Sequence, residues 1–198
     1  MKKILNLIAA ALIPISASAQ SEVGSFTFQP NVGVTIASIT GDAGKNSKCA
    51  VGLTAGVEGM YMFTDKLGAA IGLNYTGYNI SVKDGAYKGK ISSNYFFCIP
   101  IMVDYYVIQG LALKAGLSLN LRSTSKLDGK DNIVVDGKSI EYKSYFRRGF
   151  LTVPVGASYE INNIVFDARY NIGVRNVITD RDVESTFNAF SFTVGYKF

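Results

Sequence analysis

Apolar residues alternate with polar or small residues along most of the chain. The alternation occurs in eight segments, which are 26–37, 50–63, 67–80, 94–107, 111–122, 147–161, 164–175 and 189–198. Successive side chains of a strand point to opposite faces, so this period of two predicts β-strands with one apolar face. After residue 20 there is no long helical stripe and no run of about 18 apolar residues. We therefore expect an all-β protein without transmembrane helices.

The connections between these segments alternate between short and long. Residues 64–66, 108–110 and 162–163 form short connections, and Asn162-Asn163 suits a type I′ turn. The connections 38–49, 81–93, 123–146 and 176–188 are long and polar. Short turns at one end and long loops at the other are typical of bacterial outer-membrane barrels. A strand of about 12 residues tilted by about 40° spans roughly 30 Å, the thickness of a bilayer core.

The pattern predicts an eight-stranded antiparallel up-and-down transmembrane β-barrel with both mature termini on the periplasmic side. The alternative is a secreted, soluble, lipocalin-like barrel with an apolar ligand cavity. Two features favour the membrane barrel. The less apolar face is rich in glycine, which suits a narrow interior: Gly52, Gly56, Gly72, Gly116, Gly156, Gly173 and Gly195. Aromatic residues near the short-turn ends of the apolar face suit an interfacial girdle: Tyr61, Phe63, Tyr105 and Tyr159.

The first 19 residues have the pattern of a cleaved signal peptide. Lys2 and Lys3 precede a mostly apolar stretch, and Ala17-Ser18-Ala19 provides small residues at the expected cleavage site. We expect cleavage after Ala19, which leaves residues 20–198 as the barrel domain. The signal predicts export, and together with the barrel pattern it predicts a multi-pass protein of the bacterial outer membrane.

Composition narrows the possible chemistry. Charged residues make up 18% of the chain and hydrophobic residues 48%, whereas an ordinary soluble domain has about 25% charged residues. The chain has no His, which excludes an imidazole base and every His-ligated metal site. Its net charge of +5 comes without an Arg-rich run, so nucleic acid is not an expected partner. We expect no cofactor, no metal site and no catalytic site.

Ten charged residues fall on the face that we assign to the lumen: Glu58, Asp104, Lys114, Arg122, Arg148, Glu160, Asp167, Arg169, Arg175 and Lys197. The interior of an eight-stranded barrel is just wide enough to be filled by its side chains, and charges buried there need partners. The favoured interpretation is an ion-pair plug. The alternatives are a plug that rearranges to pass small solutes and, less favoured, acid–base chemistry at Glu160 and Asp167.

Two prolines and two cysteines interrupt the pattern. Pro100 and Pro154 fall inside strands, where each removes a ladder donor, and we interpret them as local bulges. By parity Cys49 faces outward and Cys98 inward, on strands that are not neighbours. We therefore expect two free thiols.

Several segments resemble a known family. The last strand, Phe190 to Phe198, ends on an aromatic residue and looks like the recognition signal of outer-membrane barrels, with Phe192, Val194, Tyr196 and Phe198 as the signal residues. The segments Tyr95–Tyr106, Leu117–Leu121 and Phe166–Val174 resemble the PorT-like outer-membrane β-barrel family of Bacteroidetes. Where many members carry an acidic residue before Ile-Pro, this chain has Cys98. The resemblance implies outer-membrane lipid and the barrel-assembly machinery as partners, but by itself it does not carry over a secretion role.

The third long connection contains a further hairpin signal. Asp136-Gly137 separates Asn132–Val135 from Lys138–Tyr142, which predicts that the fifth and sixth strands continue past the membrane as a ribbon. We therefore expect a structural or surface-interaction protein that acts through its extracellular loops, with an extracellular or periplasmic protein as a possible partner. The alternatives are a narrow, porin-like channel and an accessory subunit of an outer-membrane secretion system.

Overall fold

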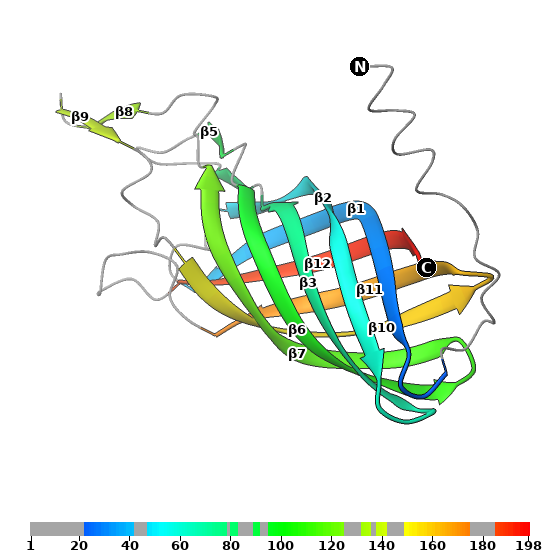
Figure 1. Ribbon diagram of the computed structural model, residues 1–198. Helices are drawn as coiled ribbons and strands as arrows, with labels where there is room; N and C mark the ends of the chain where they lie inside the picture. The colour runs from blue at the N-terminus through cyan, green and yellow to red at the C-terminus, as the bar shows by residue number, and fades with distance from the viewer. Residues whose placement is uncertain are drawn as a thin grey trace, which may run out of the picture.

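The computed structural model describes residues 22–41, 47–78, 80–82, 89–91, 95–124, 132–135, 138–141, 149–174 and 185–198. Eight long strands form the wall of a barrel (Figure 1): β1 (Phe26–Gly41), β2 (Ser47–Met62), β3 (Leu67–Gly77), β6 (Tyr95–Ile108), β7 (Leu111–Thr124), β10 (Gly149–Ile161), β11 (Ile164–Gly173) and β12 (Ser185–Tyr196). Four short strands lie at the long-loop end: β4 (Ile80–Val82), β5 (Gly89–Ile91), β8 (Asn132–Val135) and β9 (Lys138–Glu141).

The barrel is closed, because β1 pairs with both β2 and β12 and every pairing in the wall is antiparallel. Its stagger follows from the register. A walk from Phe26 around the wall through paired residues returns to β1 at Ile36, ten residues further along, by way of Tyr61, Ala69, Val103, Ala115, Val155, Tyr170 and Phe190. Such a stagger in eight strands corresponds to a tilt of about 40°. The predicted fold class is confirmed.

Each predicted strand is present, with small changes at its ends. β3 stops at Gly77, and Ile80–Val82 pairs separately with β2. β12 begins at Ser185, earlier than predicted, because it pairs with the extended end of β1 at Gly41. Asn162 and Asn163 have φ angles of 47° and 70°, as the predicted type I′ turn requires.

The predicted bulges at the two prolines are wrong. Pro100 keeps its partner Ser118 in β7, and the register between β3 and β6 is the same on both sides of the proline. Pro154 likewise pairs with Asn171 without a register shift. A proline lacks only its own N–H, so one neighbouring ladder loses a bond while the strand stays in register. The glycine opposite Pro100 makes room for its ring, since a Cβ at Gly72 would lie 3.0 Å from Pro100 Cγ.

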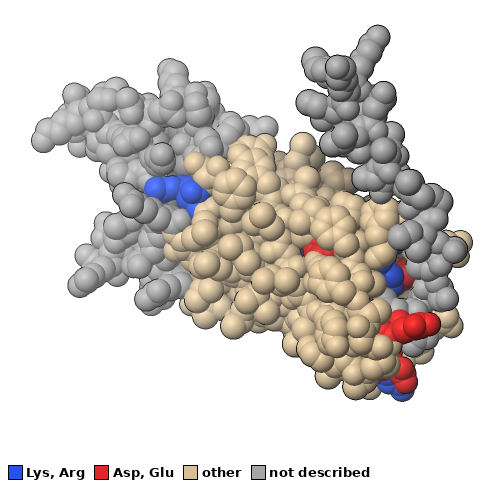
Figure 2. Space-filling view, in the orientation of Figure 1, with Lys and Arg blue, Asp and Glu red and all other residues tan. Residues whose placement is uncertain are grey.

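The outer face of the barrel is apolar. Its strands expose large hydrophobic side chains such as Leu53, Ile71 and Ile101, which are 64%, 57% and 58% exposed. Figure 2 shows a broad uncharged band across the visible face, with most charged side chains near its ends. The predicted girdle residues Tyr61, Phe63, Tyr105 and Tyr159 all lie on this outer face. An apolar outer band and a charged interior invert the arrangement of a soluble lipocalin-like barrel.

A second group of outward aromatic residues lies at the long-loop end, which the sequence analysis did not single out. Tyr75 stacks on Tyr95 with ring centroids 5.0 Å apart, and its centroid lies 5.2 Å from that of Phe97. The apolar band is thus flanked by aromatic rings at both ends, as in outer-membrane barrels. In the part of the chain that the structure describes, no helix is long and apolar enough to cross a membrane.

Two further predictions fall at the margins of the described residues. The predicted signal peptide and its cleavage site lie outside them, so cleavage after Ala19 stays a prediction. The hairpin in the third long connection is present in its backbone, because β8 and β9 pair antiparallel from Asn132↔Glu141 to Val135↔Lys138. Among the described residues it forms a separate two-stranded sheet and is not a continuation of the fifth and sixth wall strands, β7 and β10.

Candidate functional site

The lumen of the barrel holds a layer of charged side chains, which we call the ion-pair layer: Glu58, Asp104, Lys114, Asp167 and Arg169. They come from β2, β6, β7 and β11, and each stands at an inward position of its strand. Asp104 and Lys114 are direct partners in the register of β6 and β7. Lys114 and Arg169 both reach Glu58 on β2, and Lys114 also reaches Asp167 on β11, although none of these strand pairs is adjacent in the wall. Arg169 and Asp167 are two residues apart on β11 itself.

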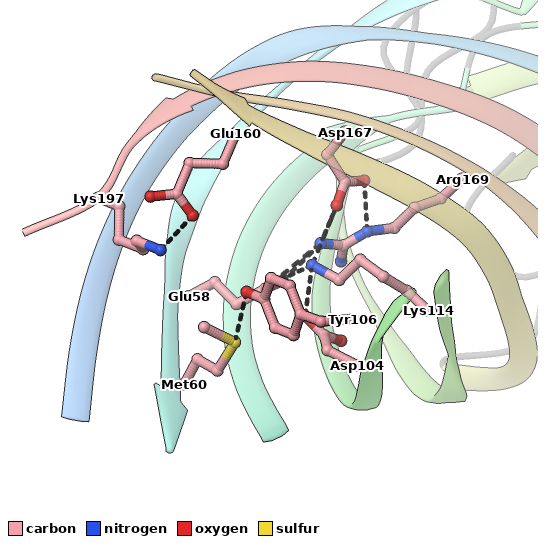
Figure 3. A network of polar contacts seen from close by, with 9 residues as sticks. All are labelled: Glu58, Met60, Asp104, Tyr106, Lys114, Glu160, Asp167, Arg169 and Lys197. Atoms are coloured by element: carbon pink, nitrogen blue, oxygen red, sulfur yellow. Dashed lines mark hydrogen bonds and ion pairs between the residues drawn. The ribbon is translucent and has the colours of Figure 1, made fainter. Parts of the chain in front are cut away.

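Lys114 and Arg169 connect the three carboxylates (Figure 3). Lys114 Nζ lies 2.8 Å from Glu58 Oε1, 3.2 Å from Asp104 Oδ2 and 3.0 Å from Asp167 Oδ2. Arg169 donates from its guanidinium to Glu58 Oε2 at 2.8 Å and to both Asp167 oxygens, at 2.6 and 2.8 Å. Charge-assisted bonds of this kind fix side chains strongly in a low-dielectric interior.

A second ion pair lies beside this layer, toward the short-turn end of the barrel. Lys197, just after β12, donates to Glu160 on β10, and the side chains are 5% and 3% exposed. The two groups together contain four carboxylates and three cations. Asp104 Oδ1 and Glu160 Oε1 are buried without a hydrogen-bond partner among the described residues.

Of the predicted lumenal residues, one lies away from this network and two have no described position. Arg122 is half-buried near the long-loop end of β7, away from the layer. Arg148 and Arg175 lie outside the described residues. The remaining seven predicted residues are the members of the ion-pair layer together with Glu160 and Lys197.

Apolar side chains close the lumen at both ends, which the sequence analysis missed. Toward the long loops, Tyr78, Phe96, Phe150 and Phe187 are each at most 3% exposed, and Tyr78 lies 5.1 to 6.3 Å from the other three rings. Toward the short turns, Met60, Met62, Ala70 and Met102 form a buried cluster with Tyr106. The alternation could have indicated these layers, because these apolar residues stand at positions that it assigns to the lumen.

A small cavity lies on each side of the ion-pair layer. The upper cavity, toward the long loops, has a volume of about 40 Å³ and a neutral polar lining that includes Asn74, Thr76 and Ser118. Asp167 and Arg169 border it. The lower cavity has a volume of about 10 Å³, and Asp104 and Glu160 are among its lining residues. The upper cavity has room for a few waters and the lower for about one.

The two cysteines and the C-terminal residues lie on the faces that the alternation predicts. Cys49 is exposed and Cys98 is buried, and both are free thiols, as predicted. Phe192 is exposed on the outer face, and Val194, Tyr196 and Phe198 are partly buried. Phe198 closes the barrel through its backbone, because its N–H donates to the Phe28 carbonyl and its own carbonyl accepts from the Phe28 N–H.

Residues 18–179 match the family described as outer membrane protein beta-barrel domain. The chain belongs to this family. It is therefore an outer-membrane β-barrel protein, as the apolar band and closed wall indicate. The finer resemblance to PorT-like members stays a prediction. No curated protein matches the sequence significantly.

Solved structures align with the chain at low sequence identity. Neisserial surface protein A aligns with a TM-score of 0.50 and 20% identity, covering 89% of this chain and 100% of that protein. Ail, the attachment invasion locus protein of Yersinia pestis, aligns with a TM-score of 0.49 and 14% identity over 89% and 99%. Outer membrane protein W of E. coli aligns at 0.42 and 17% over 89% and 99%. At these identities the likeness concerns the fold alone.

Proposed function

We propose that this protein is a surface-interaction protein of the outer membrane, in which the barrel anchors the extracellular segments and its lumen is a structural plug. We further propose that it is a PorT-like member of its family and has no catalytic site. A partner would be a protein that meets the chain outside the membrane.

The closed lumen is the observation that carries this proposal. From the long loops to the short turns, the interior passes through an aromatic layer, a small polar cavity, the ion-pair layer, a smaller cavity and a methionine cluster. Breaking the ion-pair layer would leave several buried charges without partners, at a cost of several kcal/mol. A stable obstruction of this kind favours a role outside the barrel over transport through it.

The backbone at the long-loop end supports the same proposal. β8 and β9 form a separate hairpin, and β4 and β5 extend the sheet from the top of β2. Strands at this end of the barrel provide backbone edges to which a protein partner can add. The hairpin lies in a segment with more Lys and Arg than Asp and Glu, since residues 123–148 contain six of the former and four of the latter.

Single-channel recording in planar bilayers tests the plug. The refolded protein is expected to give no discrete conductance steps, because side chains fill the lumen. A variant that lacks both cations of the layer, Lys114→Ala with Arg169→Ala, provides the positive control for an opened interior. Frequent, uniform steps from the wild-type barrel would contradict the proposal.

Replacement of residues 128–145 by a Gly-Ser linker of equal length tests the surface role. Cells that display the wild-type barrel are expected to adhere to a protein-coated surface or a host-cell layer, and cells with the linker variant to lose that adhesion. The barrel itself stays intact in the variant, as the heat shift of its gel mobility would show. Unchanged adhesion by the linker variant would contradict a role for the hairpin.

A narrow channel is the second candidate, because polar cavities flank the ion-pair layer on both sides. In that case the layer would rearrange to pass water-sized solutes. The bilayer recordings separate the two candidates. A role as accessory subunit of a secretion system would instead appear as a secretion defect on deletion, with a silent barrel in the bilayer.

A further inference from the structure

We propose that the open edge of β8 pairs with the same strand of a second copy of this chain, so that two hairpins join into one four-stranded sheet outside the membrane. The inference rests on the proposed surface role and deepens it, because it names the partner of the hairpin formed by β8 and β9.

The first observation is that β8 has an open edge. Within the described part of the chain β8 pairs with β9 alone, and the two strands form a sheet of their own at the long-loop end (Figure 1). The backbone N–H and C=O groups of every second residue of β8 therefore point away from β9. Such an edge accepts a further strand. Added strands stabilise the hairpin, because two strands by themselves are at best marginally stable in water.

The second observation is that nothing in the sequence of β8 opposes this pairing. Among the described strands at the long-loop end, β5 and β9 also have an open edge. β5 has three residues, one of them a lysine, and β9 contains a lysine and a glutamate. Charged residues on an edge strand discourage pairing with another chain. β8 is Asn-Ile-Val-Val, without a charged residue, and its Ile and Val residues are β-branched and favour strands.

The third observation is that β8 is complementary to itself. Antiparallel pairing centred on Val134 places Ile133 opposite Val135 of the second copy, and Val135 opposite Ile133 of that copy. Alternate residues of a strand share a face, as do direct partners in a ladder, so these residues of both copies lie on one face of the new sheet. Ile140, the partner of Ile133 in β9, stands on the same face in each hairpin. A shift by one residue would break up this apolar face, so the pattern selects the register.

A second copy fits this edge better than an unrelated strand does. A two-fold contact repeats each interaction, so a single self-complementary strand supplies both of its sides. The barrels also hold the hairpins of neighbouring copies at the same height above the membrane, which raises their effective concentration. An unrelated protein would have to bring a matching apolar strand of its own.

Disulfide cross-linking in lipid vesicles tests the pairing. Val134→Cys and its matched control Ser139→Cys are each made in a Cys49→Ser background, in which the remaining Cys98 is buried. Ser139 is the partner of Val134 within the hairpin. In the four-stranded sheet the two Cα atoms at position 134 are about 5 Å apart, whereas those at position 139 are three strand spacings, about 14 Å, apart. A disulfide forms only below about 7 Å, so Val134→Cys should give dimers roughly tenfold faster than Ser139→Cys.

A charge swap at the centre of the contact shows whether both sides come from β8. Val134→Lys and Val134→Glu each place like charges opposite one another, so neither variant should associate with itself. A mixture of the two variants should associate, because a lysine then stands opposite a glutamate. Energy transfer between dyes on the exposed Cys49 reads association in vesicles, and the heat shift of gel mobility shows that each barrel is folded. Ser139→Lys is the control of equal charge change and should associate as wild type does.

Equally slow cross-linking of Val134→Cys and Ser139→Cys would overturn the proposal, and so would undiminished association of Val134→Lys with itself. If that result comes with loss of adhesion in the linker variant of residues 128–145, the surface role stands and the partner is an unrelated protein. Preferential cross-linking at position 134 together with unchanged adhesion of the linker variant would instead contradict the surface role and support the contact between copies.

Discussion

Lys114 Nζ and Glu58 Oε1 lie 2.8 Å apart across the lumen, although the two residues are 56 positions apart in the sequence. Between their strands, β7 and β2, lie β6 and β3. The contact therefore ties together parts of the wall that are three strands apart, and it forms only where the intervening sheet curves around the lumen in the correct register.

Replacement of Lys114 by Met tests how much the layer contributes to stability. The variant would leave Glu58, Asp104 and Asp167 with Arg169 as their only cation in the layer. Removing one partner from a buried pair typically destabilises a protein by about 3–5 kcal/mol. Urea unfolding of the refolded barrel in lipid vesicles measures the change.

Lys66→Met is the matched control, because Lys66 is exposed in the turn between β2 and β3. Its loss should change the free energy of unfolding by less than about 0.5 kcal/mol. A second variant, Lys114→Met with Asp104→Asn, should recover part of the loss because one of the unpaired carboxylates is neutral. Equal stability of Lys114→Met and wild type would show that the layer does not hold the barrel together.

A substitution at Gly116 tests how closely β7 approaches the backbone of β6. A Cβ at this position would collide with the carbonyl oxygen of Ile101 and lie 2.8 Å from Met102 Cα. Since backbone atoms of β6 cannot give way cheaply, Gly116→Val should prevent closure or cost more than about 3 kcal/mol. The fraction of protein that shows a heat-shifted gel band measures the loss.

Ala115→Val is the control for this strand. Ala115 precedes Gly116 but faces outward, where a larger apolar side chain meets lipid. It should fold as wild type does. Normal folding of both variants would mean that the glycine face of the barrel is not required for its narrow interior.

The sequence predicts the strands and their faces well because both depend on local alternation. Parity alone assigns Glu58, Lys114 and Asp167 to the lumen. The pairing of Asp104 with Lys114 was also within reach, because both residues lie about equally far from the turn at Gln109–Gly110. A hairpin fixes its own register, so neighbours across a short turn follow from the sequence.

The contacts across the lumen could not be predicted in the same way. Whether Lys114 contacts Glu58 depends on the registers of all the strand pairs between them, and the sequence pattern does not determine those registers.

The aromatic layer was missed for a different reason. Tyr78 stands at an inward position of the predicted segment 67–80, but only the charged inward residues were singled out. Phe187 precedes the predicted start of the last strand, so the alternation did not include it. The prolines were misjudged because one lost donor does not shift a register that its other neighbour maintains.

Cys98 provides a natural reporter of the aromatic layer. Its thiol lies 3.7 Å from the Tyr78 hydroxyl, which also donates to Asn120 Oδ1 at 3.3 Å. In a Cys49→Ser background, Cys98 should react very slowly with a thiol reagent while the barrel is folded, because it is 5% exposed beneath the rings. Tyr78→Ala should raise the labelling rate by roughly tenfold, as local protection is lost.

The control for this experiment is Tyr61→Ala, which removes an aromatic ring from the outer girdle and leaves the lumen unchanged. Its Cys98 should stay as protected as in the background protein. Rapid labelling of Cys98 with Tyr78 in place would contradict a closed long-loop end.

The variant Phe198→Ala distinguishes the assembly of the barrel in the cell from the stability of the folded barrel. Its backbone bonds to Phe28 do not depend on the aromatic ring, so Phe198→Ala should refold in detergent with nearly wild-type stability. If the terminal ring is read by the barrel-assembly machinery, the same variant should accumulate poorly in the outer membrane. Phe190→Ala is the matched control, because Phe190 is an outward aromatic of β12, just before the chain end, and is 45% exposed. The heat-shifted band in the outer-membrane fraction gives the yield of each variant.

Equal yields from Phe198→Ala and wild type would show that the ring is not the signal. A loss of yield confined to Phe198→Ala would instead place recognition at the chain end.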